Sequence, residues 1–246
     1  MQETRTKKPL RTSIIVKAGF LATVSIVLTR FFSLMLLLGG LPALRVGFGS
    51  IPLIMAGMMF GPVVGGITGV VADIVGYMIN PMGGTFFPGF TLTAALYGVI
   101  SGLLFKNIKI QNMKVNFNII NALVMVIFGV GLFMLVMNTG LPTESNTLLI
   151  IVLMILVTAL FVVIPFVISK KFKGDERLVS FDKIAFVVSV TYVINALLLN
   201  TLWLSIMFDQ GFIAFLPGRV IAAVVTIPVY TIVIYTLGRL INLLEQ

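Results

Sequence analysis

The chain has 246 residues, of which 59% are apolar and only 10% charged, and its formal net charge is +9. It contains no cysteine and no histidine, which excludes disulfides, thiolate chemistry and the usual zinc sites and removes the commonest general base. Several uninterrupted runs of about 20 apolar residues predict an all-α integral membrane protein rather than a soluble core or a membrane β-barrel.

Eight helices are predicted in one membrane domain that comprises residues 1–246. They cover residues 13–38, 51–61, 64–79, 91–105, 117–138, 147–169, 182–208 and 217–241. The second and third are short and meet at Gly61-Pro62, where proline ends one helix and can begin the next. Helices that do not reach both interfaces are tolerated where loops pack over them.

The basic residues indicate how the helices are oriented. If the N-terminus lies inside, 14 of the 17 lysines and arginines fall in inner segments, Arg45 and Arg219 fall in outer loops, and Arg30 lies within a span. This asymmetry follows the positive-inside rule and predicts cytoplasmic N- and C-termini. It also accounts for the net charge without a nucleic-acid partner.

The segment Ile79–Ala95, INPMGGTFFPGFTLTAA, falls on the outside in this orientation. It carries no charge, yet it contains two prolines, three glycines and three phenylalanines. Proline restricts φ, and glycine permits backbone shapes that other residues avoid. A plain connector between membrane helices is usually short and polar, so this aromatic loop is better suited to covering a ligand.

Two charged residues, Asp73 and Arg30, lie inside predicted spans. A charge at that depth costs about 3 kcal/mol on insertion scales and usually faces a partner or a polar cavity. Three interpretations follow: a structural Arg30–Asp73 ion pair, an Arg30 side chain that reaches the outer interface, or a binding cavity with fixed charges. Tyr77 follows Asp73 by one helical turn and shares its face.

Other aromatic, amide and basic residues gather at the same outer level. They are Arg45, Phe86, Phe87, Phe90, Asn200, Thr201, Trp203 and Arg219. Singly, each has an ordinary explanation: Trp203 suits the aromatic belt of the membrane interface, and Arg45 suits a solvated loop. Together with Asp73 they suit a ligand with a flat, hydrogen-bonding ring and an anionic end, because aromatic faces stack on rings and arginines bind carboxylates in bidentate fashion.

The absent motifs narrow the function. The sequence has no GxxxxGK[ST] loop for ATP hydrolysis, no HExxH motif and no pair of intramembrane carboxylates for catalysis. A proton or sodium relay would need more acidic residues within the spans. We therefore expect a binding protein that is not an enzyme and holds no cofactor or metal. The rivals are an intramembrane enzyme acting on a lipid-linked substrate and a purely structural scaffold.

Small residues recur at three- and four-residue spacing in three helices. They are Gly65, Gly69, Ala72 and Gly76 in residues 64–79, Thr91, Ala94, Ala95, Gly98 and Gly102 in residues 91–105, and Ala18 and Ala22 in the first helix. Such faces let helices approach closely in lipid. We expect internal packing for the first two sets. Ala18 and Ala22 form an AxxxA strip that would serve either internal packing or the docking of another helix.

Five stretches of the sequence carry a resemblance to a known family. They are LTRFFS (28–33), LRVGFGSIP (44–52), FGPVVGGITGVVADIVGYMINPMGGTFFPGFTLTAAL (60–96), LLLNTLWLS (197–205) and LPGR (216–219). The long middle stretch is specific. Across residues 10–106 and 183–241 the chain resembles the folate-specific S components, which are the substrate-binding membrane subunits of energy-coupling factor (ECF) vitamin transporters.

The resemblance implies an S-component bundle of six helices, into which this chain inserts two further transmembrane helices at about residues 107–182, between core helices 4 and 5. It implies a subunit of an importer in the bacterial cell membrane, without an ATPase of its own. The AxxxA motif of Ala18 and Ala22 would dock onto a transmembrane coupling subunit that bears two ATPase subunits. The vitamin would bind near the extracellular side, beneath a lid formed by residues 44–52 and 79–95.

On this reading the ligand is folate or a reduced folate, with another flat vitamin or a pterin-like compound as the alternative. The expected substrate contacts are Arg30, Arg45, Phe48, Asp73, Tyr77, Phe86, Phe90, Thr91, Asn200, Trp203 and Arg219. Arginines would hold the glutamate carboxylates, Asp73 and Asn200 the pterin edge, and the phenylalanines and Trp203 the ring faces. Membrane lipid would surround the bundle.

Overall fold

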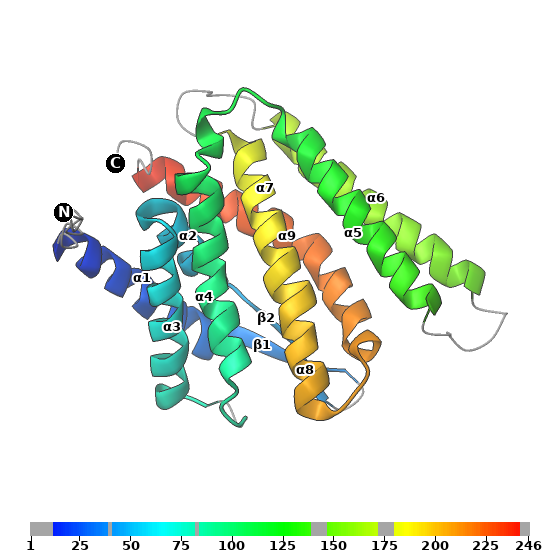
Figure 1. Cartoon of the computed structure of the whole chain (residues 1–246), viewed down its shortest axis with the longest axis horizontal. Coiled ribbons are helices and arrows are strands. Elements are labelled where there is room, and N and C mark those ends of the chain that lie inside the picture. The colour runs from blue at the N-terminus through cyan, green and yellow to red at the C-terminus, as the bar shows by residue number, and fades with distance from the viewer. Residues whose placement is uncertain (1–11, 39–40, 82–83, 139–146, 172–179, 242–246) are drawn as a thin grey trace, which may run out of the picture.

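The structure is a computed structural model that describes residues 12–38, 41–81, 84–138, 147–171 and 180–241, and most of these residues are helical (Figure 1). The α-helices are α1 (Thr12–Arg30), α2 (Ser50–Phe60), α3 (Pro62–Ile79), α4 (Pro88–Gly102), α5 (Phe117–Asn138), α6 (Thr147–Lys171), α7 (Phe181–Tyr192), α8 (Asn200–Phe208) and α9 (Phe212–Ile241). A π-helical turn, η3 (Val193–Leu199), joins α7 to α8, and the short helices η1 (Leu103–Asn107) and η2 (Ile110–Asn112) follow α4.

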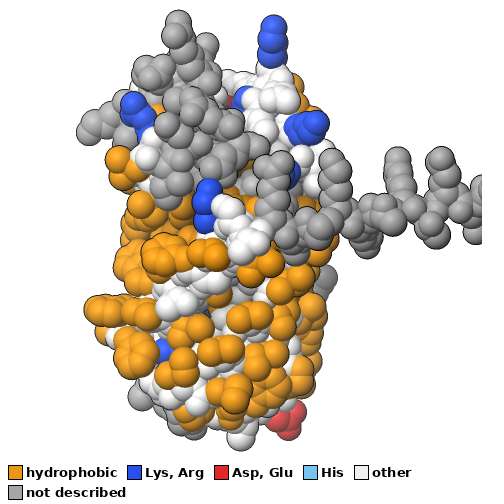
Figure 2. Space-filling view, turned by 90° about the vertical axis from the view of Figure 1, so that its left-hand side faces the viewer, with side chains coloured by type: hydrophobic (Ala, Val, Ile, Leu, Met, Phe, Trp, Pro, Cys, Tyr) orange, Lys and Arg blue, Asp and Glu red, His pale blue; other side chains and the backbone are white. Residues whose placement is uncertain are grey.

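Six of these helical segments are long and apolar enough to cross a membrane. They are Thr12–Arg30, Pro62–Ile79, Pro88–Asn112, Phe117–Asn138, Phe181–Phe208 and Phe212–Leu240. The predicted all-helical membrane fold is therefore confirmed. Figure 2 shows the matching surface, a broad band of hydrophobic side chains with lysines and arginines gathered toward one end. This distribution fits a bundle that lipid surrounds.

The first helix is shorter than predicted. It was expected to run to residue 38, but α1 ends at Arg30 and the apolar residues after it form strand β1 (Ser33–Leu38), which pairs antiparallel with β2 (Leu41–Gly47). Hydropathy alone does not separate an apolar helix from an apolar strand. The glycine pair at positions 39 and 40 lies between the strands, and such a pair is a recognised hairpin signal.

Helices α2, α3 and α4 form the tightest part of the bundle, with every residue from Ile51 to Met58 of α2 buried. A Cβ atom on Gly98 would lie 2.8 Å from the Cα of Gly65, and one on Gly65 would lie 2.6 Å from the Cα of Gly57. The three helices therefore touch backbone to backbone. The packing predicted for the small residues of α3 and α4 is confirmed at these positions.

The two helices predicted as an insertion, α5 and α6, pack on the side of the bundle that α7 and α9 form (Figure 1). The backbone N–H of Phe117 donates to Asp182 Oδ2 at 3.0 Å, and the Phe117 ring lies 5.3 Å from that of Phe186. Within the pair, Asn118 Nδ2 donates to Ser169 Oγ at 2.9 Å. These contacts hold the additional helices against the outer face of α7, whose other faces enclose the site described next.

Candidate functional site

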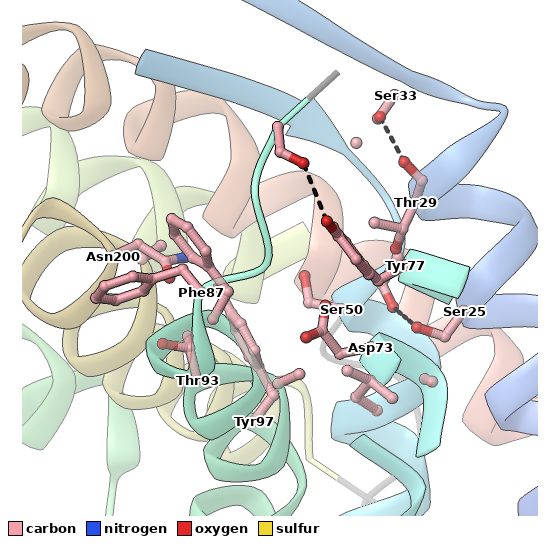
Figure 3. Close-up of a pocket in the computed structure, with 18 of the residues that line it drawn as sticks. Ser25, Thr29, Ser33, Ser50, Asp73, Tyr77, Phe87, Thr93, Tyr97 and Asn200 are labelled. Atoms are coloured by element: carbon pink, nitrogen blue, oxygen red, sulfur yellow. Dashed lines mark hydrogen bonds between the residues drawn. The ribbon is translucent and has the colours of Figure 1, made fainter. Parts of the chain in front are cut away.

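A cavity of about 550 Å³ lies between the core helices and the segments that connect them. Its walls come from α1, α2, α3, α4, α7, η3, α8 and α9, from the base of the β1–β2 hairpin and from the segment that precedes α4. Figure 3 shows Asp73, Tyr77, Tyr97 and Asn200 around this space. The volume falls within the range of small-molecule pockets, which is roughly 300–1,000 Å³.

Seven of the eleven predicted substrate contacts line the cavity. They are Arg30, Asp73, Tyr77, Phe86, Phe90, Asn200 and Arg219. The predicted covering loop contributes strongly, because Pro81, Gly84, Thr85 and Phe87 also line the space. The structure therefore brings together residues that lie up to 189 positions apart in the sequence.

Arg30 and Asp73 form an ion pair, with Nη2 of the arginine 3.3 Å from Oδ1 of the aspartate. Arg30 Nη1 also donates to the carbonyl oxygen of Asn80 at 3.2 Å, and Thr91 Oγ1 donates to Asp73 Oδ2 at 2.7 Å. The Arg30 side chain is 6% exposed, so it does not extend to the interface. The ion-pair interpretation is confirmed, and the pair also lines the cavity, where it ties α1, α3 and α4 together.

The aromatic loop before α4 is held by its own rings and by Trp203. The Tyr77 hydroxyl donates to the carbonyl oxygen of Gly84 at 3.3 Å, and the Tyr77 ring meets Phe86 edge-on at 5.2 Å. Phe87 lies 5.9 Å from Trp203, whose indole N–H donates to Thr93 Oγ1 at 3.0 Å. Trp203 thus packs against Phe87 of this loop and does not itself line the cavity.

Three further predicted contacts do not line the cavity. Thr91 acts through its hydrogen bond to Asp73. Phe48 is 44% exposed, and its ring lies 6.3 Å from that of Tyr230. Arg45 pairs with Met35 in the hairpin backbone, and its side chain lies outside the described part of the chain. Thr91, Phe48 and Trp203 contact residues that do line the space, and their direct contact with a ligand stays a prediction.

The π-helical turn η3 places Asn200 and Arg219 in the cavity wall. Within it the N–H of Asn200 donates to the carbonyl oxygen of Asn195, five residues back, and Nη1 of Arg219 donates to the carbonyl oxygen of Ala196 at 2.8 Å. π-Helical turns of this kind often mark functional sites. Oδ1 of Asn200 is buried and accepts no hydrogen bond from any described residue.

Tyrosine is the residue type that the sequence reasoning missed. Four of the five tyrosines line the cavity, namely Tyr77, Tyr97, Tyr192 and Tyr230, and only the first was predicted. Tyr192 and Tyr230 meet edge-on, with ring centroids 5.9 Å apart and planes at 86°. A tyrosine inside an apolar span that is not at an interface was the available signal, since a buried hydroxyl usually needs a polar partner.

The AxxxA strip turns partly inward. Ala22 is buried against the core, whereas Ala18 is half-buried. The exposed face of α1 carries Ile15, Val16 and Phe20. The internal-packing alternative therefore holds for Ala22 in this structure, and the docking role of Ala18 and Ala22 stays a prediction.

Comparison with known proteins places this architecture in a family. The family model described as "ECF transporter, substrate-specific component" matches residues 14–144, which is more than half of the chain. A curated relative, "Folate transporter FolT" of Clostridium novyi (strain NT), is 43% identical over 105 residues. That alignment spans 43% of this chain and 58% of the relative.

The fold also has a counterpart among solved structures. A crystal structure described as "Crystal structure of FolT bound with folic acid" superposes with a TM-score of 0.57 at 24% sequence identity, covering 94% of this chain and 95% of that chain. At this identity the likeness concerns the fold. Together with the family model, it shows that this multi-pass membrane protein belongs to the substrate-specific components of ECF transporters.

Proposed function

We propose that this chain binds folate, or a reduced folate, from the extracellular side and serves as the specificity subunit of an ECF-type ABC importer. The observation that carries the proposal is the lining of the 550 Å³ cavity: four tyrosines, four phenylalanines, two arginines and one carboxylate. Among the described lining residues, the arginines outnumber the acidic side chains. That composition suits a flat, hydrogen-bonding ring joined to an anionic tail.

The geometry refines the role of each charged group. Arg30 is engaged by Asp73 and the Asn80 carbonyl, so its first task is to hold that carboxylate at the cavity wall. Arg219 lines the cavity from α9, and it would meet a glutamate carboxylate of the ligand. Asp73 and the buried Oδ1 of Asn200 would accept hydrogen bonds from the amino and ring N–H groups of the pterin.

The partners follow from the family. We propose that the chain works with a transmembrane coupling subunit and two ATPase subunits, which supply the energy for uptake, and that no covalent chemistry occurs in this chain. Both termini would be cytoplasmic in the bacterial cell membrane, with lipid as the surroundings and no nucleic acid as a partner. Docking of the coupling subunit near Ala18 and Ala22 would involve the exposed apolar residues beside them on α1.

Calorimetry on the purified protein tests the ligand. We expect folate or a reduced folate to bind more tightly than riboflavin, thiamine or unsubstituted pterin, because only the folates join a flat ring to two carboxylates. Mass spectrometry of small molecules that co-purify with the protein provides an independent readout. Tighter binding of another vitamin would change the ligand, and a complete lack of binding across the panel would favour the scaffold alternative.

Replacing Asp73 with asparagine should weaken folate binding at least tenfold by calorimetry. The amide keeps the size of the side chain but loses the charge that pairs with Arg30 and one of the acceptor oxygens offered to the pterin. Asp182→Asn is the matched control, because Asp182 accepts from the Phe117 N–H far from the cavity. Unchanged affinity in Asp73→Asn would remove Asp73 from the ligand site.

A further inference from the structure

The base of the β1–β2 hairpin forms part of the cavity wall, since Ser33, Gly47, Gly49 and Ser50 all line the space. Ser33 opens β1 and Gly47 closes β2, and these two residues pair directly. A Cβ atom on Gly47 would lie 2.8 Å from Cβ of Ser33, so the two strands meet closely there. These residues therefore join the hairpin to the cavity wall.

On one side, α1 holds this base. Ser33 Oγ donates to the carbonyl oxygen of Thr29 at 2.6 Å, and Ser25 Oγ donates to the carbonyl oxygen of Gly49 at 2.7 Å. Gly49 sits so close to α1 that an added Cβ would lie 3.0 Å from Cβ of Thr29. These contacts join the hairpin to α1, the helix that leads into it. Its attachment to α9 depends on other groups.

On the other side, Tyr230 of α9 provides hydrogen bonds to the described residues at the base of the hairpin. The Tyr230 hydroxyl donates to the carbonyl oxygen of Gly47 and accepts from Ser50 Oγ at 3.0 Å. Tyr230 is 4% exposed and is fixed by its edge-on contact with Tyr192. One hydroxyl thus links the last residue of β2, the first residue of α2 and the wall of α9.

We propose that Tyr230 is the positioning residue that holds the hairpin against the cavity and thereby sets the rate at which the ligand leaves. Gly47 is the last residue of β2. The hydrogen bond from the Tyr230 hydroxyl to its carbonyl oxygen closes the cavity wall between the hairpin and α9. Without that donor, a partly buried carbonyl loses a hydrogen bond, and the described hydrogen bonds that remain at the base of the hairpin come from α1. The part of this inference that concerns ligand release rests on the proposed folate function.

The test uses a nitroxide label on the hairpin. The chain has no cysteine, so Leu34→Cys, at a position in β1 that is 71% exposed, carries the only label. In ligand-free protein we expect Tyr230→Phe to make the label markedly more mobile by electron paramagnetic resonance. Tyr235→Phe is the matched control, because that buried tyrosine of the same helix packs on Phe181 and does not line the cavity.

Binding kinetics provide the second readout. In stopped-flow measurements folate should dissociate at least tenfold faster from Tyr230→Phe than from wild type, with a smaller change in the association rate. The dissociation rate from Ser50→Ala should lie between those of Tyr230→Phe and wild type. Unchanged label mobility in Tyr230→Phe would overturn the proposal, even if affinity fell, because the tyrosine would then act as a ligand contact. The mobility test needs no ligand, so a failure of folate to bind the wild type would contradict the proposed function separately.

Discussion

Folate binding should weaken at least tenfold when Arg219 is replaced by alanine, as measured by calorimetry on the purified protein. The guanidinium is held in the cavity wall by the carbonyl of Ala196. Charge-assisted hydrogen bonds of this kind contribute about 1.5–3 kcal/mol, and a tenfold loss of affinity corresponds to about 1.4 kcal/mol. A bidentate contact to a carboxylate would place the loss at or above that value.

Two variants make this result specific. Arg239→Ala makes the same change near the C-terminal end of the same helix, where the side chain is exposed beside Tyr235 and lies outside the cavity lining. This variant should bind folate as wild type does. Arg219→Lys keeps the charge but loses the planar guanidinium that can bind a carboxylate in bidentate fashion, so its folate affinity should lie between those of Arg219→Ala and wild type. Wild-type affinity in Arg219→Ala would remove this residue from the ligand site.

A second large effect is expected on stability. Gly98→Ala should destabilise the protein by about 3 kcal/mol, because the added methyl group meets the backbone of Gly65 and neither helix can rotate a side chain out of the way. For a chain of this size the midpoint of thermal unfolding should fall by roughly 10 °C. Thermal unfolding in detergent, followed by circular dichroism, measures the change.

Gly131→Ala is the matched control, because that helical glycine of α5 has no atom within 4 Å of an added Cβ. Its melting temperature should stay the same or rise slightly, since alanine favours helix over glycine. If Gly98→Ala has the same melting temperature as Gly131→Ala and wild type, the close contact between α3 and α4 is not a determinant of stability.

Much of the fold could be predicted from the sequence, because membrane helices are marked by length and hydropathy. The short helices at Gly61-Pro62 and the packing of small residues in α3 and α4 followed from the same local chemistry. The β1–β2 hairpin could not be predicted that way. Its residues are as apolar as those of a helix, and the hydrogen bonds between its strands form only once the two segments meet.

The site residues that could be predicted are those whose charge is energetically costly within a membrane span. Arg30 and Asp73 stood out because a charge within a span needs a partner, and the structure pairs them. Tyr97, Tyr192 and Tyr230 gave only the weaker signal of a hydroxyl group within an apolar span, and only the tertiary structure shows that they share a cavity. Trp203 was expected to contact the ring face of the ligand; in the structure its indole N–H donates to Thr93 Oγ1 and its ring packs on Phe87.

The length of α1 has a consequence for the lid. Its 19 residues span about 28 Å, which is close to the thickness of the hydrocarbon core. In the proposed orientation the helix is only long enough to cross, and the hairpin that follows would lie at the level of the outer headgroups. Phe31, Phe32 and Leu34, which are 62%, 67% and 71% exposed, would face the lipid there. Bilayer thickness and headgroup composition would thus become part of the environment in which the proposed ligand enters and leaves.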